Sequence, residues 1–186
     1  MALDTVERIQ QISRVYRLLL SSVLLLLYFA TSDSLLIRAN HENLYLLTSL
    51  IWLALVIFST LGRLITRQDF LIETSANYII DFVAISILAY ACGGVESGLL
   101  YLTLPMIAMA GLEVPSRLSL LIAVTATLGE LIVEFMVSLE SVTAETYFFQ
   151  AGLLGTTLFL VSLGFNLAQD WLRTAEAEVE KSTRTA

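Results

Sequence analysis

The chain has 186 residues, of which 57% are hydrophobic and only 15% are charged, whereas soluble domains have about 25% charged residues. Such an apolar chain predicts an integral membrane protein and excludes an ordinary soluble domain. The net charge of −7 excludes a general nucleic-acid-binding protein, because such proteins need a basic surface. The single cysteine, Cys92, excludes an intramolecular disulfide and a thiolate metal site.

The apolar runs predict an all-α fold, a polytopic integral membrane helical bundle with six transmembrane helices. A spanning helix needs about 20 largely apolar residues. The six predicted spans are 15–31, 44–62, 76–92, 98–112, 118–139 and 147–168. The third and fourth spans are short and are separated by glycines, so a re-entrant hairpin buried in protein is the alternative for this pair.

Basic residues fall almost entirely on one side of these spans. Nine of the ten Lys and Arg residues precede the apolar core of the first span, which begins at Leu18, or follow the sixth span, or lie in the second and fourth connections. The exception is Arg38. Since basic residues concentrate on the cytoplasmic side of a membrane protein, both termini are predicted to be cytoplasmic.

Three segments of different character follow from this pattern. Residues 1–14 are a cytoplasmic segment whose apolar residues recur at every third position, which predicts an interfacial amphipathic helix, with a frayed tail as the alternative. Residues 15–169 form the transmembrane module. Its first run is interpreted as an uncleaved span rather than a cleaved signal peptide, because the segment before it is long for one. Residues 170–186 have mixed charge and no Gly or Pro, which predicts the start of a cytoplasmic signalling helix.

Three carboxylates lie inside predicted spans: Asp81, Glu130 and Glu134. A charge at the bilayer centre costs roughly 2.5–3.5 kcal/mol, so such residues face protein or a water-filled cavity. Glu130 and Glu134 are one helical turn apart and share a face. All three are candidates for a signal-binding or ligand-binding site, with interhelical hydrogen bonding as the alternative role. No Lys or Arg is predicted within a span to pair with them.

The segment between the third and fourth spans is GGVESG. Its Gly93, Gly94, Ser97 and Gly98 predict a tight structural turn, because glycine permits positive φ and close helix approach. Pro105 predicts a kink in the fourth helix. His41, the sole histidine, is predicted to be a solvated loop residue, and one histidine makes no usual zinc site. We therefore expect no metal and no cofactor.

The stretch from residue 80 to residue 112, IDFVAISILAYACGGVESGLLYLTLPMIAMAGL, resembles the N-terminal membrane sensor module of PilS-type sensor histidine kinases. The matching features are Asp81 in the third helix, then Tyr90-Ala91, then Gly93-Gly94 with Ser97-Gly98. Weaker support comes from Arg117, Ala123 and a late glutamate in the fifth helix. Cys92 departs from the pattern, because a small or hydroxyl-bearing residue is expected there.

This resemblance implies a bacterial inner-membrane, multi-pass receptor that forms a homodimer and regulates type IV pili, with a pilin transmembrane segment as the sensed partner. The phosphoacceptor and ATP-binding motifs of a histidine kinase do not occur in these 186 residues, so we expect signal sensing without catalysis in this chain. Two alternatives from other classes stay open. One is a small proton-coupled transporter that uses Asp81 and Glu130, and the other is a membrane assembly or scaffold subunit. The lipid bilayer is an expected partner, and nucleic acid is not.

Overall fold

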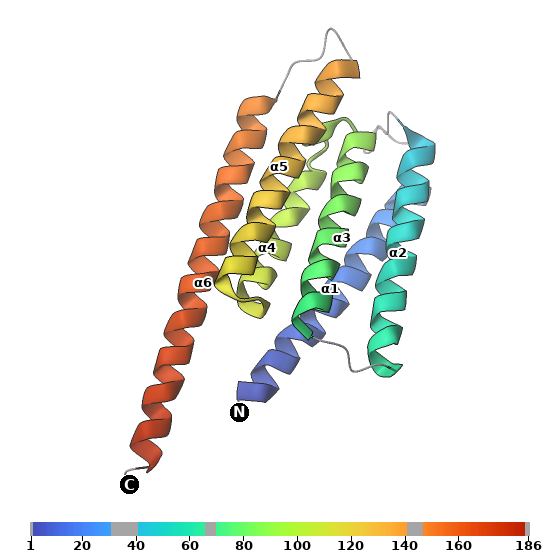
Figure 1. Cartoon of the computed structure of the whole chain (residues 1–186). Helices are drawn as coiled ribbons and strands as arrows, with labels where there is room; N and C mark the ends of the chain where they lie inside the picture. Colours follow the sequence, from blue (N-terminus) through green and yellow to red (C-terminus); the bar gives the residue numbers. More distant parts are fainter. Residues whose placement is uncertain (1, 31–40, 66–69, 141–146, 185–186) are drawn as a thin grey trace.

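In a computed structural model, the chain folds into a bundle of long α-helices (Figure 1). The structure describes residues 2–30, 41–65, 70–140 and 147–184. In chain order these residues form α1 (Ala2–Ala30), α2 (Glu42–Ile65), α3 (Phe70–Ala91), the 3-10 helices η1 (Gly94–Ser97) and η2 (Leu99–Leu102), α4 (Thr103–Glu113), α5 (Ser116–Glu140) and α6 (Phe148–Arg184). The described elements are all helical, so the predicted all-α fold is confirmed.

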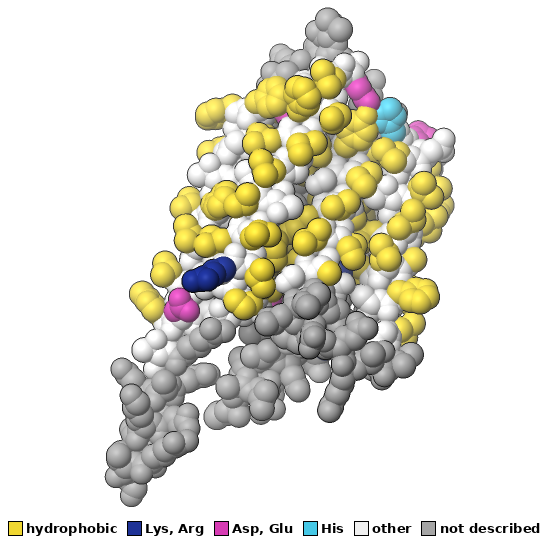
Figure 2. Space-filling model, in the orientation of Figure 1, with side chains coloured by type: hydrophobic (Ala, Val, Ile, Leu, Met, Phe, Trp, Pro, Cys, Tyr) yellow, Lys and Arg dark blue, Asp and Glu magenta, His cyan; other side chains and the backbone are white. Residues whose placement is uncertain are grey.

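The outer surface of the bundle is apolar, as expected for a protein solvated by lipid (Figure 2). Large side chains such as Phe58 and Phe149 are 78% and 82% exposed. Within the described part of the chain, five helices are long and apolar enough to cross a membrane, and the segment Leu99–Glu113 is a shorter apolar helix. Exposed apolar surface of this extent is stable in lipid and not in water.

The short α4 lies inside the bundle, where it packs against α1, α3, α5 and α6. Its buried residues are Thr103, Met106, Ile107, Ala110 and Gly111. Because protein surrounds it, α4 need not match the length of a lipid-exposed span. The chain from η1 to α4 leads from one end of the bundle back to the other, where α5 begins (Figure 1). The structure therefore shows a six-helix bundle and not a re-entrant hairpin at α3 and α4.

Pro105 lies in the first turn of α4, which begins at Thr103. The first N–H groups of an α-helix have no acceptor within the helix, so a proline there removes no helical hydrogen bond. The place of Pro105 in α4 therefore requires no kink, and the kink in the fourth helix stays a prediction. The irregular backbone precedes Pro105 and consists of the two 3-10 helices.

Both chain ends lie at the same end of the bundle, as an even number of crossings requires (Figure 1). We name this the termini end, and we name the opposite end, which holds His41, η1, Glu140 and Tyr147, the far end. The helix α1 is continuous through residue 14, and α6 is continuous from Phe148 to Arg184. The predicted division at residues 14 and 169 coincides with no helix boundary and stays a prediction about function.

Candidate functional site

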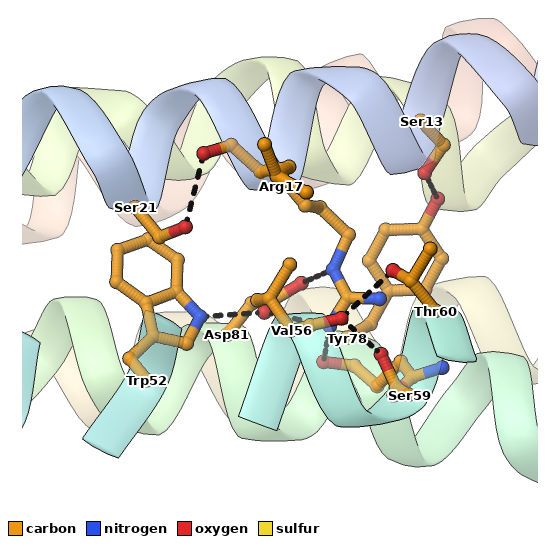
Figure 3. A network of polar contacts seen from close by, with 11 residues as sticks. Ser13, Arg17, Ser21, Trp52, Val56, Ser59, Thr60, Tyr78 and Asp81 are labelled. Atoms are coloured by element: carbon orange, nitrogen blue, oxygen red, sulfur yellow. Dashed lines mark hydrogen bonds and ion pairs between the residues drawn. The ribbon is translucent and has the colours of Figure 1, made fainter. Parts of the chain in front are cut away.

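Asp81, in the middle of α3, is fully buried where three helices meet (Figure 3). Arg17 of α1 approaches it with two nitrogens: Nη2 donates to Oδ1 at 2.9 Å, and Nε forms an ion pair with Oδ2. Trp52 of α2 donates its indole N–H to Oδ1 at 2.8 Å. A single carboxylate therefore joins α1, α2 and α3.

The contact matches the fork shape of a guanidinium group, which binds a carboxylate through two N–H groups. Arg17 is only 7% exposed, and its Nη2 also lies 3.5 Å from the carbonyl oxygen of Asn77. Removing one member of a buried ion pair costs about 3–5 kcal/mol, because the other member is left as an unpaired buried charge. The Arg17–Asp81 pair is therefore a strong link between helices.

The sequence analysis found no cationic partner for Asp81 within a span, and that expectation was wrong. The apolar span of α1 begins at Gln10, so Arg17 lies inside this span and not before it. Ser13, Arg17 and Ser21 follow one another at single-turn spacing and are all buried. A polar face at this spacing is the sequence signal that could have identified Arg17 as inward-facing.

A small polar cavity lies beside the ion pair on the side of the termini end. Its volume of about 20 Å³ is enough for a water molecule. All the residues that line it have polar side chains: Gln10, Ser13, Arg14, Arg17, Ser59, Thr60, Thr74, Asn77, Tyr78 and Glu113. The hydroxyl groups of Ser13 and Tyr78 lie 3.3 Å apart (Figure 3). Four helices thus surround a site that can hydrate the ion pair.

Glu130 and Glu134 are each 1% exposed and lie on one face of α5, but they contact different segments. The hydroxyl of Thr103, at the start of α4, lies 3.1 Å from Glu130 Oε1. Glu134 accepts two backbone N–H groups, from Tyr147 at 2.7 Å and from Val95 at 3.4 Å. The structure therefore does not bring the three carboxylates into one site, because Asp81 lies against α1 and α2.

The glycine-rich turn at the far end adopts the backbone that its sequence predicted. Gly93, Gly94 and Gly98 have φ angles of 93°, 79° and 73°, in the region that favours glycine. Ser97 Oγ donates to the Gly94 carbonyl at 2.7 Å. A Cβ atom at Gly94 would lie 2.9 Å from Glu134 Oε2. Glu134 thus ties this turn to Tyr147, the residue before α6.

A second polar cluster, which was not predicted from the sequence, joins the residue before α2 to α3 and α5 at the far end. We name His41, Tyr90 and Glu140 the far-end cluster. His41 Nε2 lies 3.2 Å from Glu140 Oε2, and the Tyr90 hydroxyl donates to Glu140 Oε1. The rings of His41 and Tyr90 are stacked, with centroids 5.6 Å apart. His41 was predicted to be a solvated loop residue. Its side chain is 43% exposed but has defined partners.

These polar groups connect helices. In the part of the chain that the structure describes, no three His, Cys, Asp or Glu side chains are grouped so as to hold a metal ion. One link joins α1, α2 and α3, a second joins η1 and α5 to the residue before α6, and a third lies at the far end. Links of this kind fix the positions of helices relative to one another. Because each link can break without the others, such a bundle can change between arrangements of its helices.

Comparison with known proteins agrees with this description. The family model described as PilS-like transmembrane domain matches residues 2–179. The chain is 32% identical over 157 residues to the sensor protein kinase PilS of Pseudomonas aeruginosa, with 84% of this chain and 29% of that protein covered. The chain thus spans less than a third of that relative's length. No solved structure matches it. The match is to a transmembrane domain, so no kinase activity is assigned to these residues.

Proposed function

Because this chain belongs to the family of PilS-like transmembrane domains, we propose that it passes a signal from the bacterial inner membrane to a cytoplasmic output. It is a multi-pass membrane sensor module. The observation that supports signal transmission is α6, which packs against α4 and α5 and continues as one helix to Arg184. At ~1.5 Å per residue this helix is about 55 Å long, whereas the hydrocarbon core of a bilayer is about 30 Å thick.

Contacts near the termini end hold α6 to the rest of the bundle. Gln169 donates its side-chain N–H to the Leu112 carbonyl at 2.7 Å. A Cβ atom at Gly111 would lie 2.8 Å from the Cβ atom of Phe165, so the backbones of α4 and α6 approach closely. Packed interfaces change between discrete arrangements and do not deform continuously. A shift of α4 would therefore move α6 as a rigid helix.

The Arg17–Asp81–Trp52 link is the proposed two-state element. A ligand changes the balance between two states only when it binds one of them more tightly. The proposed signal is a membrane-embedded partner such as a pilin transmembrane segment, which contacts α1, α2 or α3 and favours one arrangement of these helices. Because α4 packs against both α1 and α6, a rearrangement around Arg17 has a direct route to the output helix.

We also propose that the working unit is a homodimer joined along α6. A stripe of exposed side chains follows the outer face of this helix: Phe149, Leu153, Thr156, Leu160, Leu163 and Leu167. Their spacing alternates between four and three residues, which is the repeat of helices packed side by side. A second copy presents the same stripe, so the contact is self-complementary.

Cysteine cross-linking tests this dimer. Leu160→Cys in a Cys92→Ser background should cross-link copies in native membranes. Leu139→Cys is the matched control, because Leu139 and Leu160 are both 64% exposed but lie on different helices. Equal cross-linking at the two positions would contradict a dimer joined along α6.

A small proton-coupled transporter is the competing function. Buried Glu130 favours it, because its Oε2 has no hydrogen-bond partner in the described part of the chain. Asp81 argues against it, since Arg17 and Trp52 already contact its carboxylate. A transporter also needs a path to both sides of the membrane. The described residues that line the polar cavity beside Arg17 lie on the termini side of the bundle and do not extend to the far end.

The decisive experiment joins this module to a histidine kinase core and measures its output. Asp81→Asn keeps the shape of the side chain but removes its charge. We expect basal output to change by about fivefold or more, the lower end of coupling free energies of ~1–3 kcal/mol, with normal insertion. Glu96→Gln, at an exposed carboxylate in η1, should leave the output unchanged. Unchanged output in Asp81→Asn would contradict only the role assigned to Asp81, and not the sensor function.

The same protein in liposomes separates the two functions. A sensor module should give no proton flux above that of empty liposomes. A flux that Asp81→Asn or Glu130→Gln abolishes would show the transporter to be the correct function.

A further inference from the structure

A groove open to the lipid runs along the contact between α3 and α5. Its walls include Ile79, Val83 and Tyr90 of α3 and Thr125, Gly129 and Met136 of α5. Small residues form its floor, since a Cβ atom at Gly129 would lie 3.3 Å from Ser86 Oγ. The groove has a volume of about 650 Å³, within the ~300–1,000 Å³ of small-molecule sites. Apolar side chains cover this face of the molecule (Figure 2).

The length of the groove matches one leaflet of a bilayer. From Thr125 to Met136 an α-helix rises about 16 Å, and half of a hydrocarbon core of ~30 Å is about 15 Å. A transmembrane helix docked against the bundle would contact it along the whole span. The groove instead ends at Tyr90 and Met136, one helical turn before Glu140. Its dimensions therefore suit a lipid acyl chain better than a partner helix.

The far-end cluster continues the groove directly. Tyr90 lines the groove, and its hydroxyl donates to Glu140. The side chain of Glu140 is 46% exposed, so its carboxylate is accessible from the headgroup region. Among the described residues at this end, the charged groups besides His41 are the acids Glu42, Glu96, Glu134 and Glu140. This charge favours a headgroup with an ammonium group over an anionic one.

We propose that the groove between α3 and α5 binds one phospholipid from the far-end leaflet. An acyl chain lies against Val83 and Gly129, and an ammonium headgroup, as in phosphatidylethanolamine, lies at Glu140. Lipid tails are as apolar as leucine, so an acyl chain gains no hydrophobic transfer energy when it moves from the bilayer into the groove. It gains only closer packing than it has against other lipids. The choice between lipids therefore comes from the headgroup, through a charge-assisted hydrogen bond to the carboxylate.

Native mass spectrometry tests this site. The purified full chain is delipidated in mild detergent and then given equal amounts of phosphatidylethanolamine and phosphatidylglycerol with identical acyl chains. We expect one lipid per chain to be retained, with phosphatidylethanolamine favoured about threefold, the factor that an exposed charge pair supplies.

Two pairs of variants divide the site into its parts. Val83→Trp fills the groove and should remove the retained lipid. Val124→Trp is the matched control, because Val124 lies on α5 outside the groove and is 41% exposed, against 52% for Val83. Glu140→Gln should equalise the two lipids while one remains bound, and Glu96→Gln should keep the preference for phosphatidylethanolamine.

Three results would overturn the proposal. If Val83→Trp retains as much lipid as Val124→Trp, the retained molecule is ordinary surrounding lipid. If Val83→Trp changes the fraction of dimer and not the lipid count, the groove is a contact between copies of the chain. Equal retention of both lipids by the unmodified chain would remove the assignment of the headgroup to Glu140.

Discussion

Replacing Arg17 by methionine keeps a long side chain in α1 but leaves Asp81 without its cation. Asp81 is fully buried, and Trp52 then remains as its hydrogen-bond donor among the contacts at this carboxylate. Breaking a buried ion pair from one side costs about 3–5 kcal/mol. We expect a loss in the free energy of unfolding of this size for Arg17→Met. Asp81→Asn should cost about 3 kcal/mol, at the lower end of this range, because its amide oxygen still accepts one hydrogen bond.

The double variant Arg17→Met with Asp81→Asn distinguishes a link from two separate effects. It leaves no unpaired charge in the bundle, so its cost should be smaller than the sum of the two single costs. Interaction free energies between residues in contact are about 0.5–3 kcal/mol. We expect ~2–3 kcal/mol here, since both groups are charged and buried and they make two contacts.

Reversible unfolding in mixed micelles, followed by tryptophan fluorescence, measures these free energies. Trp52 is 1% exposed and bonds to Asp81, whereas Trp171 is 77% exposed, so a Trp171→Phe background leaves one reporter at the site. Ser138→Ala is the control and should cost less than about 0.5 kcal/mol, because its exposed hydroxyl bonds within α5, to the Phe135 carbonyl. If the two single costs add to within ~0.5 kcal/mol in the double variant, Arg17 and Asp81 do not act as a pair and the reasoning is refuted.

Three further expectations concern the far end and the topology. Gly94→Leu should lower the free energy of unfolding by about 2 kcal/mol or more, since positive φ alone costs ~1–2 kcal/mol for other residues. The measurement is thermal unfolding. Gly62→Leu is the control, because nothing lies within 4 Å of a Cβ atom there. If Gly94→Leu has wild-type stability, the turn does not require glycine at this position. Glu134→Gln should cost about 1–3 kcal/mol, because its amide has one acceptor for the two N–H groups that Glu134 binds; full stability would contradict the link. A reporter that fluoresces only in the cytoplasm should be bright at either terminus, and a dark C-terminal fusion of normal abundance would refute the topology.

The helices could be predicted from the sequence wherever lipid sets their length. The second span was predicted at 44–62, and α2 is Glu42–Ile65; the fifth was predicted at 118–139, and α5 is Ser116–Glu140. A lipid-exposed helix must be apolar over about 20 residues, so composition alone marks it. The fourth helix escapes this rule because protein surrounds it. The first residues of the predicted fourth span form the 3-10 helix η2, which follows Gly98. The φ of 73° at Gly98 is a local backbone conformation that hydropathy does not predict.

The partners of the polar residues could not be predicted in the same way. The cost of a carboxylate in lipid singled out Asp81, but Arg17 is 64 residues away from it and Trp52 is 29. His41 and Glu140 are 99 residues apart. Which helix faces meet depends on the packing of the whole bundle, and no local pattern records it. The sequence therefore indicated that Asp81 needs a partner without indicating which residue supplies it.

Arg17 has two roles, one in membrane orientation and one in pairing with Asp81, and only the first was predicted from the sequence. It was counted among the basic residues that place the termini in the cytoplasm, yet it lies inside the first span and pairs with Asp81. Without it, the sequence still predicts eight basic residues on the termini side, against Arg38 on the other. We therefore expect Arg17→Met to destabilise the bundle without changing its orientation, because orientation depends on the excess of Lys and Arg near the ends of spans.

The position of Arg17 also explains how its charge enters the membrane before Asp81 is present. It lies about 10 Å from the start of its span at Gln10, by the ~1.5 Å rise per residue. A long arginine side chain at that depth reaches the interface with its charged group, so α1 can insert first and pair with α3 later. Asp81 lies at a similar depth, about 10 Å from the start of its span at Thr74, but its side chain is too short to reach the interface. Its insertion should therefore depend on Arg17 more than the reverse. In Arg17→Met, a cytoplasmic reporter placed after α2 should keep its wild-type signal, while protease access to the connection after α3 should rise. Unchanged access, or an inverted reporter signal, would refute this order.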